Sequence, residues 1–132
     1  MFAARLASGK RVLDLGSGEG YGSALLAASA AAVLGVEIDA DSVEHARRNY
    51  RLENLEFRQG SILELGDLPG GAIDVIVCFG VIEHISEHEA LMSLVRRALA
   101  PGGLFVVSTP DREIYSEAAN YRNPYHVKGA EP

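Results

Sequence analysis

A short apolar run followed by closely spaced glycines constrains this chain more than any other feature. Residues 12–23 read Val-Leu-Asp-Leu-Gly-Ser-Gly-Glu-Gly-Tyr-Gly-Ser, and an Ala/Leu-rich segment follows. This order predicts a strand, a tight loop and a helix, which is how an α/β domain opens a nucleotide pocket. Glycines let the backbone approach a ligand closely, because a Cβ would collide with it. We therefore expect a ligand at this loop.

The spacing of the glycines argues against two kinds of phosphate-binding loop. A dinucleotide-binding loop needs Gly-x-Gly-x-x-Gly, but Tyr21 stands in the place of the third glycine when the count begins at Gly16. A P-loop ends in Gly-Lys-Ser or Gly-Lys-Thr, and no such sequence follows here. A nicotinamide-dependent dehydrogenase is therefore an alternative that this spacing disfavours.

Further apolar runs alternate with helical patterns along the chain. The segments predicted as strands are 11–15, 32–38, 55–59, 73–79 and 104–108. The third alternates in polarity, which is typical of an edge strand, whereas the others are nearly continuous, as in strands covered on both faces. The segments predicted as helices are 23–31, 41–52 with Asp39 or Asp41 as N-cap, and 86–99, which Pro101-Gly102-Gly103 ends. This alternation predicts an α/β fold with a parallel sheet and a ligand beyond the C-terminal ends of its strands.

The sequence Asp-x-Gly-x-Gly-x-Gly, which begins at Asp14, resembles the first motif of the class I S-adenosylmethionine-dependent methyltransferases. S-adenosylmethionine has no phosphate but carries an ammonium, a carboxylate and a sulfonium, so an acid at the loop is useful. The resemblance spans residues 11–128 and implies a Rossmann-like sheet of about five strands with flanking helices. The stretch Tyr121-Arg-Asn-Pro-Tyr-His-Val-Lys128 resembles bacterial methyltransferases associated with small molecules and polysaccharides, which implies O-methylation of a small-molecule or sugar acceptor.

The expected cofactor site gathers residues that follow the strands. Glu37 ends the second apolar run about 20 residues beyond the glycines, where an acid can accept hydrogen bonds from both ribose hydroxyls. Ser61 stands where the resembled family often has an aspartate that holds the adenine amino group, and a polar turn explains Ser61 equally well. The expected cofactor-binding residues are Asp14, Gly16, Gly18, Gly20, Tyr21, Glu37, Ile38, Ser61, Ile62, Phe79 and Gly80.

Catalytic residues are expected near the C-terminus. His126 is a candidate general base, because imidazole titrates near neutral pH, and Asp111 and Tyr115 are further candidates. Alignment of acceptor and methyl group can also carry most of the rate. Some relatives in the resembled family bind a metal through Glu-x-x-Glu-His. Here Gly80 replaces the first acid and leaves only Glu83, His84 and His126, so no metal site is predicted.

Composition excludes several other classes of function. A length of 132 residues suggests a single domain, and a net charge of −6 argues against a nucleic-acid surface. The single cysteine, Cys78, falls inside a predicted strand and excludes an internal disulfide. No apolar run is long enough for a membrane span and no signal-peptide pattern is present, so a cytoplasmic protein is expected.

The end of the chain departs from the resembled family, whose sheet usually carries a C-terminal antiparallel hairpin. No apolar run after residue 108 would form it, so the tail at 111–132 is expected to be irregular. The strand at 104–108 should then be an exposed edge, which invites pairing with a second copy or covering by the tail, unless the chain is part of a longer protein. An S-adenosylmethionine-binding module without catalytic activity is therefore an alternative to an enzyme.

Overall fold

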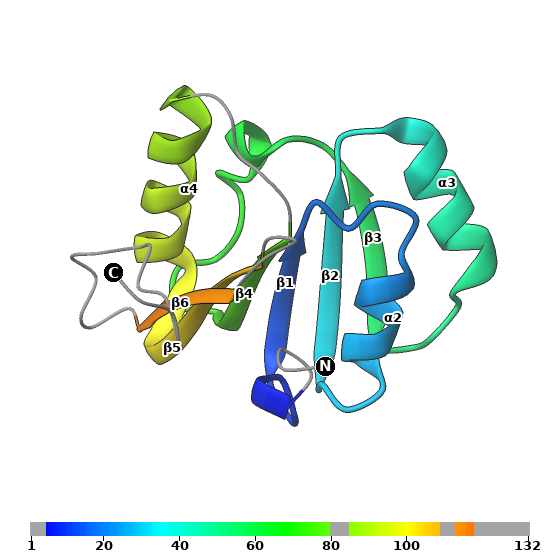
Figure 1. The fold of residues 1–132 in the computed structure, drawn as a ribbon, viewed down its shortest axis with the longest axis horizontal. Helices are drawn as coiled ribbons and strands as arrows, with labels where there is room; N and C mark the ends of the chain where they lie inside the picture. The colour runs from blue at the N-terminus through cyan, green and yellow to red at the C-terminus, as the bar shows by residue number, and fades with distance from the viewer. Residues whose placement is uncertain (1–4, 80–84, 109–112, 118–132) are drawn as a thin grey trace.

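The sheet has six strands in the order β3-β2-β1-β4-β5-β6 (Figure 1). The computed structural model describes residues 5–79, 85–108 and 113–117, and the side chains within them except those of 79, 85–87, 108 and 113–117. The strands are β1 (Arg11–Leu15), β2 (Ala32–Glu37), β3 (Leu55–Gln59), β4 (Ile73–Phe79), β5 (Leu99–Ser108) and β6 (Glu113–Glu117). The first five are parallel, so the predicted Rossmann-like sheet is confirmed.

The strand order reverses at β1, which pairs with β2 on one side and β4 on the other. Leu15, the last residue of β1, is in register with Val36 of β2 and with Cys78 of β4. The glycine loop begins at the next residue. It therefore lies at the carboxyl edge of the sheet where the order reverses, which is where ligands bind in open α/β sheets.

Helices cover both faces of the sheet, as the continuous apolar strands require. On one face α2 (Tyr21–Ala27) packs its Leu26 and Ala27 against apolar strand residues, and α3 (Ala40–Asn49) packs its Val43 and Ala46 against Phe57. On the opposite face α4 (Ile85–Ala98) packs an apolar stripe against β1, β4 and β5. The stripe consists of Leu91, Leu94, Val95 and Ala98. A short 3-10 helix, η1 (Ile62–Glu64), connects β3 to the turn before β4.

Strand β5 begins five residues earlier than predicted. The sequence pattern assigned Leu99 to the preceding helix, but α4 ends at Ala98 and Leu99 pairs with Ile73. The register then shifts, so that Val75 pairs with Leu104 and the Pro-Gly-Gly segment bulges from the strand. Proline and glycine in a strand mark such bulges, which explains why this segment was mistaken for a helix stop.

The last parallel strand is not left as an exposed edge, because the tail covers it, which was one of the two predicted ways of protecting this strand. Strand β6 runs antiparallel to β5, with Ser108 opposite Glu113 and Leu104 opposite Glu117. The tail at 111–132 is therefore not irregular at residues 113–117, and the rest of it lies outside the described residues. Because β6 covers this edge, the reason for expecting a homodimer through β5 is removed.

Within the described part of the chain, none of the helices is long and apolar enough to cross a lipid bilayer.

Candidate functional site

The glycine loop between β1 and α2 is fastened to the end of β2. The backbone N–H groups of Gly16 and Ser17 both donate to the carbonyl oxygen of Val36, at 2.8 and 3.1 Å. The N–H of Gly20 donates back to Ser17 across 3.1 Å, which closes the turn before α2. The loop is therefore held in a defined shape by backbone contacts at both of its ends.

Glu37 ties the glycine loop to the start of α3. Its Oε1 accepts a hydrogen bond from the N–H of Gly18 at 2.8 Å, and its Oε2 accepts one from the N–H of Asp39 at 3.0 Å. Each carboxylate oxygen has a further lone pair with which it can accept from a ligand hydroxyl. The structure thus brings the predicted ribose-binding acid into direct contact with the loop.

Asp14 lies beneath the loop and not on its open surface. Only 1% of Asp14 is exposed, and its Oδ2 accepts a hydrogen bond from the hydroxyl of Ser23 at 2.5 Å. Burial raises the pKa of Asp14 to about 6, while the Ser23 hydrogen bond lowers it and the charge of Glu37 raises it further. In the part of the chain that the structure describes, Oδ1 has no hydrogen-bond partner.

Neutralising Asp14 is expected to flatten the dependence of stability on pH. The folded-state pKa is raised, so Asp14 favours folding below its ordinary pKa of 3.8 and loses this contribution as pH rises through about 6. The stability of Asp14→Asn relative to the native sequence should therefore increase by up to about 3 kcal/mol between pH 4 and pH 8. Urea unfolding of both proteins at several pH values measures this difference, and parallel curves would contradict it.

Two glycines of the loop have different surroundings. A Cβ built on Gly18 would meet nothing within 4 Å. A Cβ on Gly20 would lie 2.7 Å from the Cβ of Ala46 and 2.8 Å from the Cζ of Phe57. Close packing against α3 and β3 therefore explains glycine at position 20, whereas Gly18 leaves space beside the loop. The cofactor contact expected of Gly20 stays a prediction.

The end of β3 lies beside Glu37, since the N–H of Gly60 donates to the Glu37 carbonyl oxygen at 3.0 Å. The next residue, Ser61, caps η1: its hydroxyl accepts from Leu63 N–H at 3.2 Å, and its own N–H donates to Glu64 at 2.7 Å. Ser61 thus has a structural role that the sequence pattern left open, and its adenine contact stays a prediction.

Three apolar side chains predicted to contact the cofactor differ in exposure. Tyr21 and Ile38 are each 67% exposed, at the start of α2 and just beyond β2. Ile62 is half-buried and packs against the core cluster on the α4 face. All three follow strands at the carboxyl edge of the sheet, and their contact with the cofactor stays a prediction.

The remaining predicted site residues lie where the structure describes no side chain. Phe79 is the last residue of β4, and only its backbone is described. Gly80, Asp111 and His126 lie outside the described residues, as do Glu83 and His84, the other candidate metal ligands; Tyr115 is described only as backbone in β6. Among the described side chains, no group of three His, Cys, Asp or Glu residues is placed to hold a metal ion.

Three polar or small residues near Asp14 escaped the sequence analysis. Ser23 is fully buried and binds Asp14, and Ser17 is 9% exposed within the loop. Gly35 makes room for them, because a Cβ there would lie 2.8 Å from the hydroxyl oxygen of Ser23. A glycine inside a strand often marks a close approach of this kind, so Gly35 was the signal that could have revealed the cluster.

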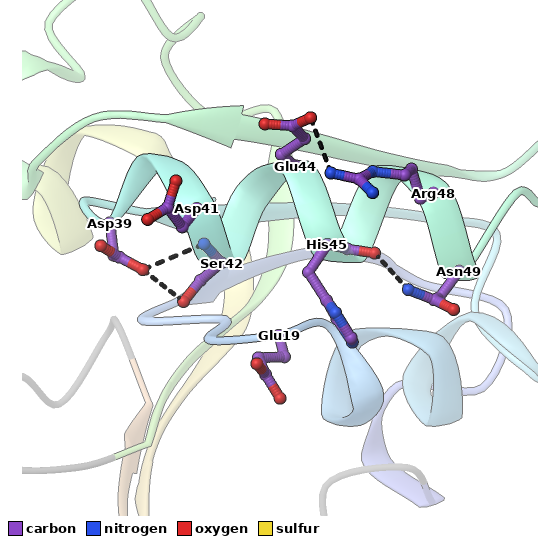
Figure 2. Close-up of a pocket in the computed structure, with 8 residues that line it drawn as sticks. All are labelled: Glu19, Asp39, Asp41, Ser42, Glu44, His45, Arg48 and Asn49. Atoms are coloured by element: carbon purple, nitrogen blue, oxygen red, sulfur yellow. Dashed lines mark hydrogen bonds and ion pairs between the residues drawn. The ribbon is translucent and has the colours of Figure 1, made fainter.

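A polar pocket of about 390 Å³ lies between the glycine loop and the outer face of α3 (Figure 2). It is lined by Glu19, Asp39, Asp41, Ser42, Glu44, His45, Arg48 and Asn49. Several of these side chains serve the helix itself. Asp39 caps it by accepting from the N–H of Ser42 at 3.0 Å, and Glu44 forms an ion pair with Arg48 at 2.7 Å. We assign no cofactor to this pocket.

Known proteins resemble this chain over most of its length. The sequence model of a family described as "Methyltransferase domain" matches residues 6–131. A probable S-adenosylmethionine-dependent methyltransferase of Mycolicibacterium smegmatis is 40% identical over 92% of this chain and 46% of its own length. A ubiquinone biosynthesis O-methyltransferase of Idiomarina loihiensis is 32% identical over 94% of this chain and 52% of its own length.

A solved S-adenosylmethionine-dependent methyltransferase of Mesorhizobium loti shares the fold. It has a TM-score of 0.72 and 23% identity over 87% of this chain and 62% of the other. The chain spans about half the length of the curated relatives it matches. On the match of almost its whole sequence to the family model, the chain belongs to the S-adenosylmethionine-dependent methyltransferase family, as its glycine motif predicted.

Proposed function

We propose that this chain binds S-adenosylmethionine at the loop between β1 and α2 and transfers its methyl group to a small-molecule or sugar hydroxyl. One contact carries the proposal: the Glu37 carboxylate accepts a hydrogen bond from Gly18 at the point where the strand order reverses. An acid and an uncrowded glycine backbone are thereby placed side by side where a nucleoside binds in this fold.

The charges of the site suit a cationic nucleoside better than a nucleotide. Glu37 is half-buried beside the loop and Asp14 is buried beneath it, while no lysine or arginine occurs between Gly16 and Arg47. A pyrophosphate would meet these carboxylates with repulsion, whereas an ammonium or sulfonium would be attracted. A carboxylate only accepts hydrogen bonds, and ribose hydroxyls can donate to it. The residues present therefore fit S-adenosylmethionine.

The bound cofactor would supply a methyl group attached to a positively charged sulfur. The chain's own contribution is to hold the adenosyl group through Glu37 and the glycine loop, and to align an acceptor oxygen with that methyl group. His126 or Asp111 would accept the proton of the acceptor hydroxyl. Relatives named ubiquinone biosynthesis O-methyltransferase support an oxygen acceptor, and a relative named trans-aconitate 2-methyltransferase supports a small one.

A second candidate is a module that binds S-adenosylmethionine without transferring its methyl group. The match covers only 46% of the M. smegmatis relative, so the acceptor-binding residues of that protein can lie outside the part that this chain resembles.

A cytoplasmic location stays a prediction. The single, buried and unpaired Cys78 is compatible with it.

Mass spectrometry of ligands that copurify with the chain is expected to find S-adenosylmethionine or its demethylated product. Calorimetric titration should show binding of S-adenosylmethionine and none of NAD at the same concentration. Release of methylated product from a panel of hydroxyl acceptors would establish the enzyme, and tight binding without turnover on any acceptor would favour the module. Preferential retention of NAD would overturn both.

A further inference from the structure

A buried polar cluster lies directly beneath the proposed cofactor loop. It consists of Asp14 from β1, Ser17 from the loop and Ser23 from α2, with exposures of 1%, 9% and 0%. The hydroxyl of Ser23 donates to Asp14 Oδ2. The Oδ1 atom of Asp14 and the Oγ atom of Ser17 are buried without a partner among the described residues. A carboxylate with so few partners depends strongly on the one donor it has.

This hydrogen bond fixes the first turn of α2, while Leu26 and Ala27 pack its last turn into the core. Helix α2 has seven residues, and its N-cap, Gly20, has no side chain that could cap it. Ser23 therefore provides a side-chain link between the first turn of α2 and the strand before the loop. Gly35 of β2 is in register with Asp14 of β1. Because Gly35 has no side chain, it leaves the space that Ser23 occupies.

We propose that Ser23 is a positioning residue that holds the Asp14 carboxylate beneath the glycine loop, so that its negative charge stabilises the cationic ligand bound above it. This inference rests on the proposed function. The Ser23 hydroxyl donates to a carboxylate, and this bond is strongest when Asp14 is ionised. A ligand that carries an ammonium group also favours the ionised form. Ser23 and the ligand therefore stabilise the same state of Asp14.

The position of Asp14 makes its charge sensitive to pH near neutrality. Its pKa of about 6 lies just below physiological pH, and removal of the Ser23 hydrogen bond would raise it. Two titratable groups on neighbouring strands interact with Asp14: Glu37 on β2 and Cys78 on β4. Residues 22–27 of α2 include no acid or base. Burial raises the pKa of Cys78 to about 11, so this thiol stays neutral over the relevant range.

Calorimetric titration with S-adenosylhomocysteine between pH 5.5 and pH 8.5 tests the proposal. This probe keeps the ammonium group and is stable over the experiment. In the native sequence, affinity should fall by about fourfold from pH 7.5 to pH 5.5, as the ionised fraction of Asp14 falls. In Ser23→Ala the fall should begin at higher pH, because the pKa of Asp14 is raised. The affinity of this variant should be at least about threefold below that of the native sequence at pH 6.5, and within about twofold of it at pH 8.5.

Two further variants separate positioning from a merely structural role. Asp14→Asn should bind weakly and lose the fall in affinity below pH 7.5, and Ser23→Cys, with its weaker donor, should lie between the native sequence and Ser23→Ala. A loss of equal size at every pH in Ser23→Ala would overturn the proposal while leaving the proposed function intact. Failure of the native chain to bind the probe at any pH would overturn both.

A measurement on the native sequence covers the case in which a variant does not fold. The carboxyl carbon of Asp14 can be titrated by nuclear magnetic resonance with and without saturating S-adenosylhomocysteine. The ligand should lower the pKa of Asp14, because binding and ionisation favour each other. An unchanged pKa would overturn the proposal.

Discussion

Replacing Gly20 with alanine is expected to destabilise the folded chain by about 2–5 kcal/mol. Gly20 has a φ of 97°, a left-handed conformation that costs an alanine about 1–2 kcal/mol. The added Cβ would also lie 2.7 Å from Ala46 and 2.8 Å from Phe57, both of which are buried. Neither neighbour can withdraw without moving α3 from β3, and overpacking of this kind costs about 1–3 kcal/mol.

Gly18→Ala is the matched control for this prediction. Gly18 has a φ of 57°, so an alanine there meets a similar backbone strain, but its Cβ would touch nothing within 4 Å. Urea unfolding followed by circular dichroism should show a loss of only about 1–2 kcal/mol for Gly18→Ala. Equal losses in the two variants would show that packing against α3 is not what requires glycine at position 20.

The parallel part of the fold was predictable because its strands are buried on both faces. Strands at 11–15 and 73–79 carry nearly continuous apolar runs, and the structure begins and ends them at the predicted residues. Asp39 was one of two predicted N-caps of α3, and it is the one that accepts from Ser42. These features depend on residues close in sequence, so local patterns contain the information.

The errors arose where distant segments decide the structure. Strand β6 has the sequence Glu-Ile-Tyr-Ser-Glu, whose short apolar pair gives little signal alone and pairs only because β5 offers an open edge. The bulge in β5 depends on its register with β4. Leu99 and Leu104 are five residues apart, but they pair with Ile73 and Val75, which are only two apart. Neither the edge nor the register is encoded within the segment itself.

The sequence predicted which loop and which acids form the candidate site, but not the buried Asp14–Ser23 hydrogen bond beneath it. Glu37 could be found by its distance from the glycines, and the structure adds a hydrogen bond from Gly18 that was not predicted; its ribose contact stays a prediction. Asp14 was expected among the cofactor-binding residues, but its burial was not foreseen, because it depends on helices that cover both faces of its strand. Its partner Ser23 gave no local signal, because an Asp–Ser hydrogen bond between a strand and a helix depends on how the two pack.

Replacing Glu37 with alanine is expected to weaken binding of S-adenosylmethionine by about 1.5–3 kcal/mol, which is roughly a 10- to 150-fold increase in Kd. The variant loses the acceptor proposed for the ribose hydroxyls. It also leaves the N–H groups of Gly18 and Asp39 without their carboxylate partner. Glu44→Ala, which removes an exposed acid from α3, is the charge-matched control and should leave the Kd within about twofold. Calorimetric titration measures both, and an unchanged Kd in Glu37→Ala would remove this acid from the site.

A double-mutant cycle with the ligand separates the two roles of Glu37. If the carboxylate holds the ribose, a 2′-deoxy analogue of S-adenosylhomocysteine should bind the native chain more weakly than the parent compound, and this difference should shrink in Glu37→Ala. If Glu37 acts only by holding Gly18 and Asp39, both ligands should lose the same affinity in the variant, since the loop is shared by both complexes. A coupling free energy near zero would therefore leave Glu37 as a support for the loop. A coupling of about 1 kcal/mol or more would place its carboxylate against the ribose, because only a group in contact with the missing hydroxyl can respond to its loss.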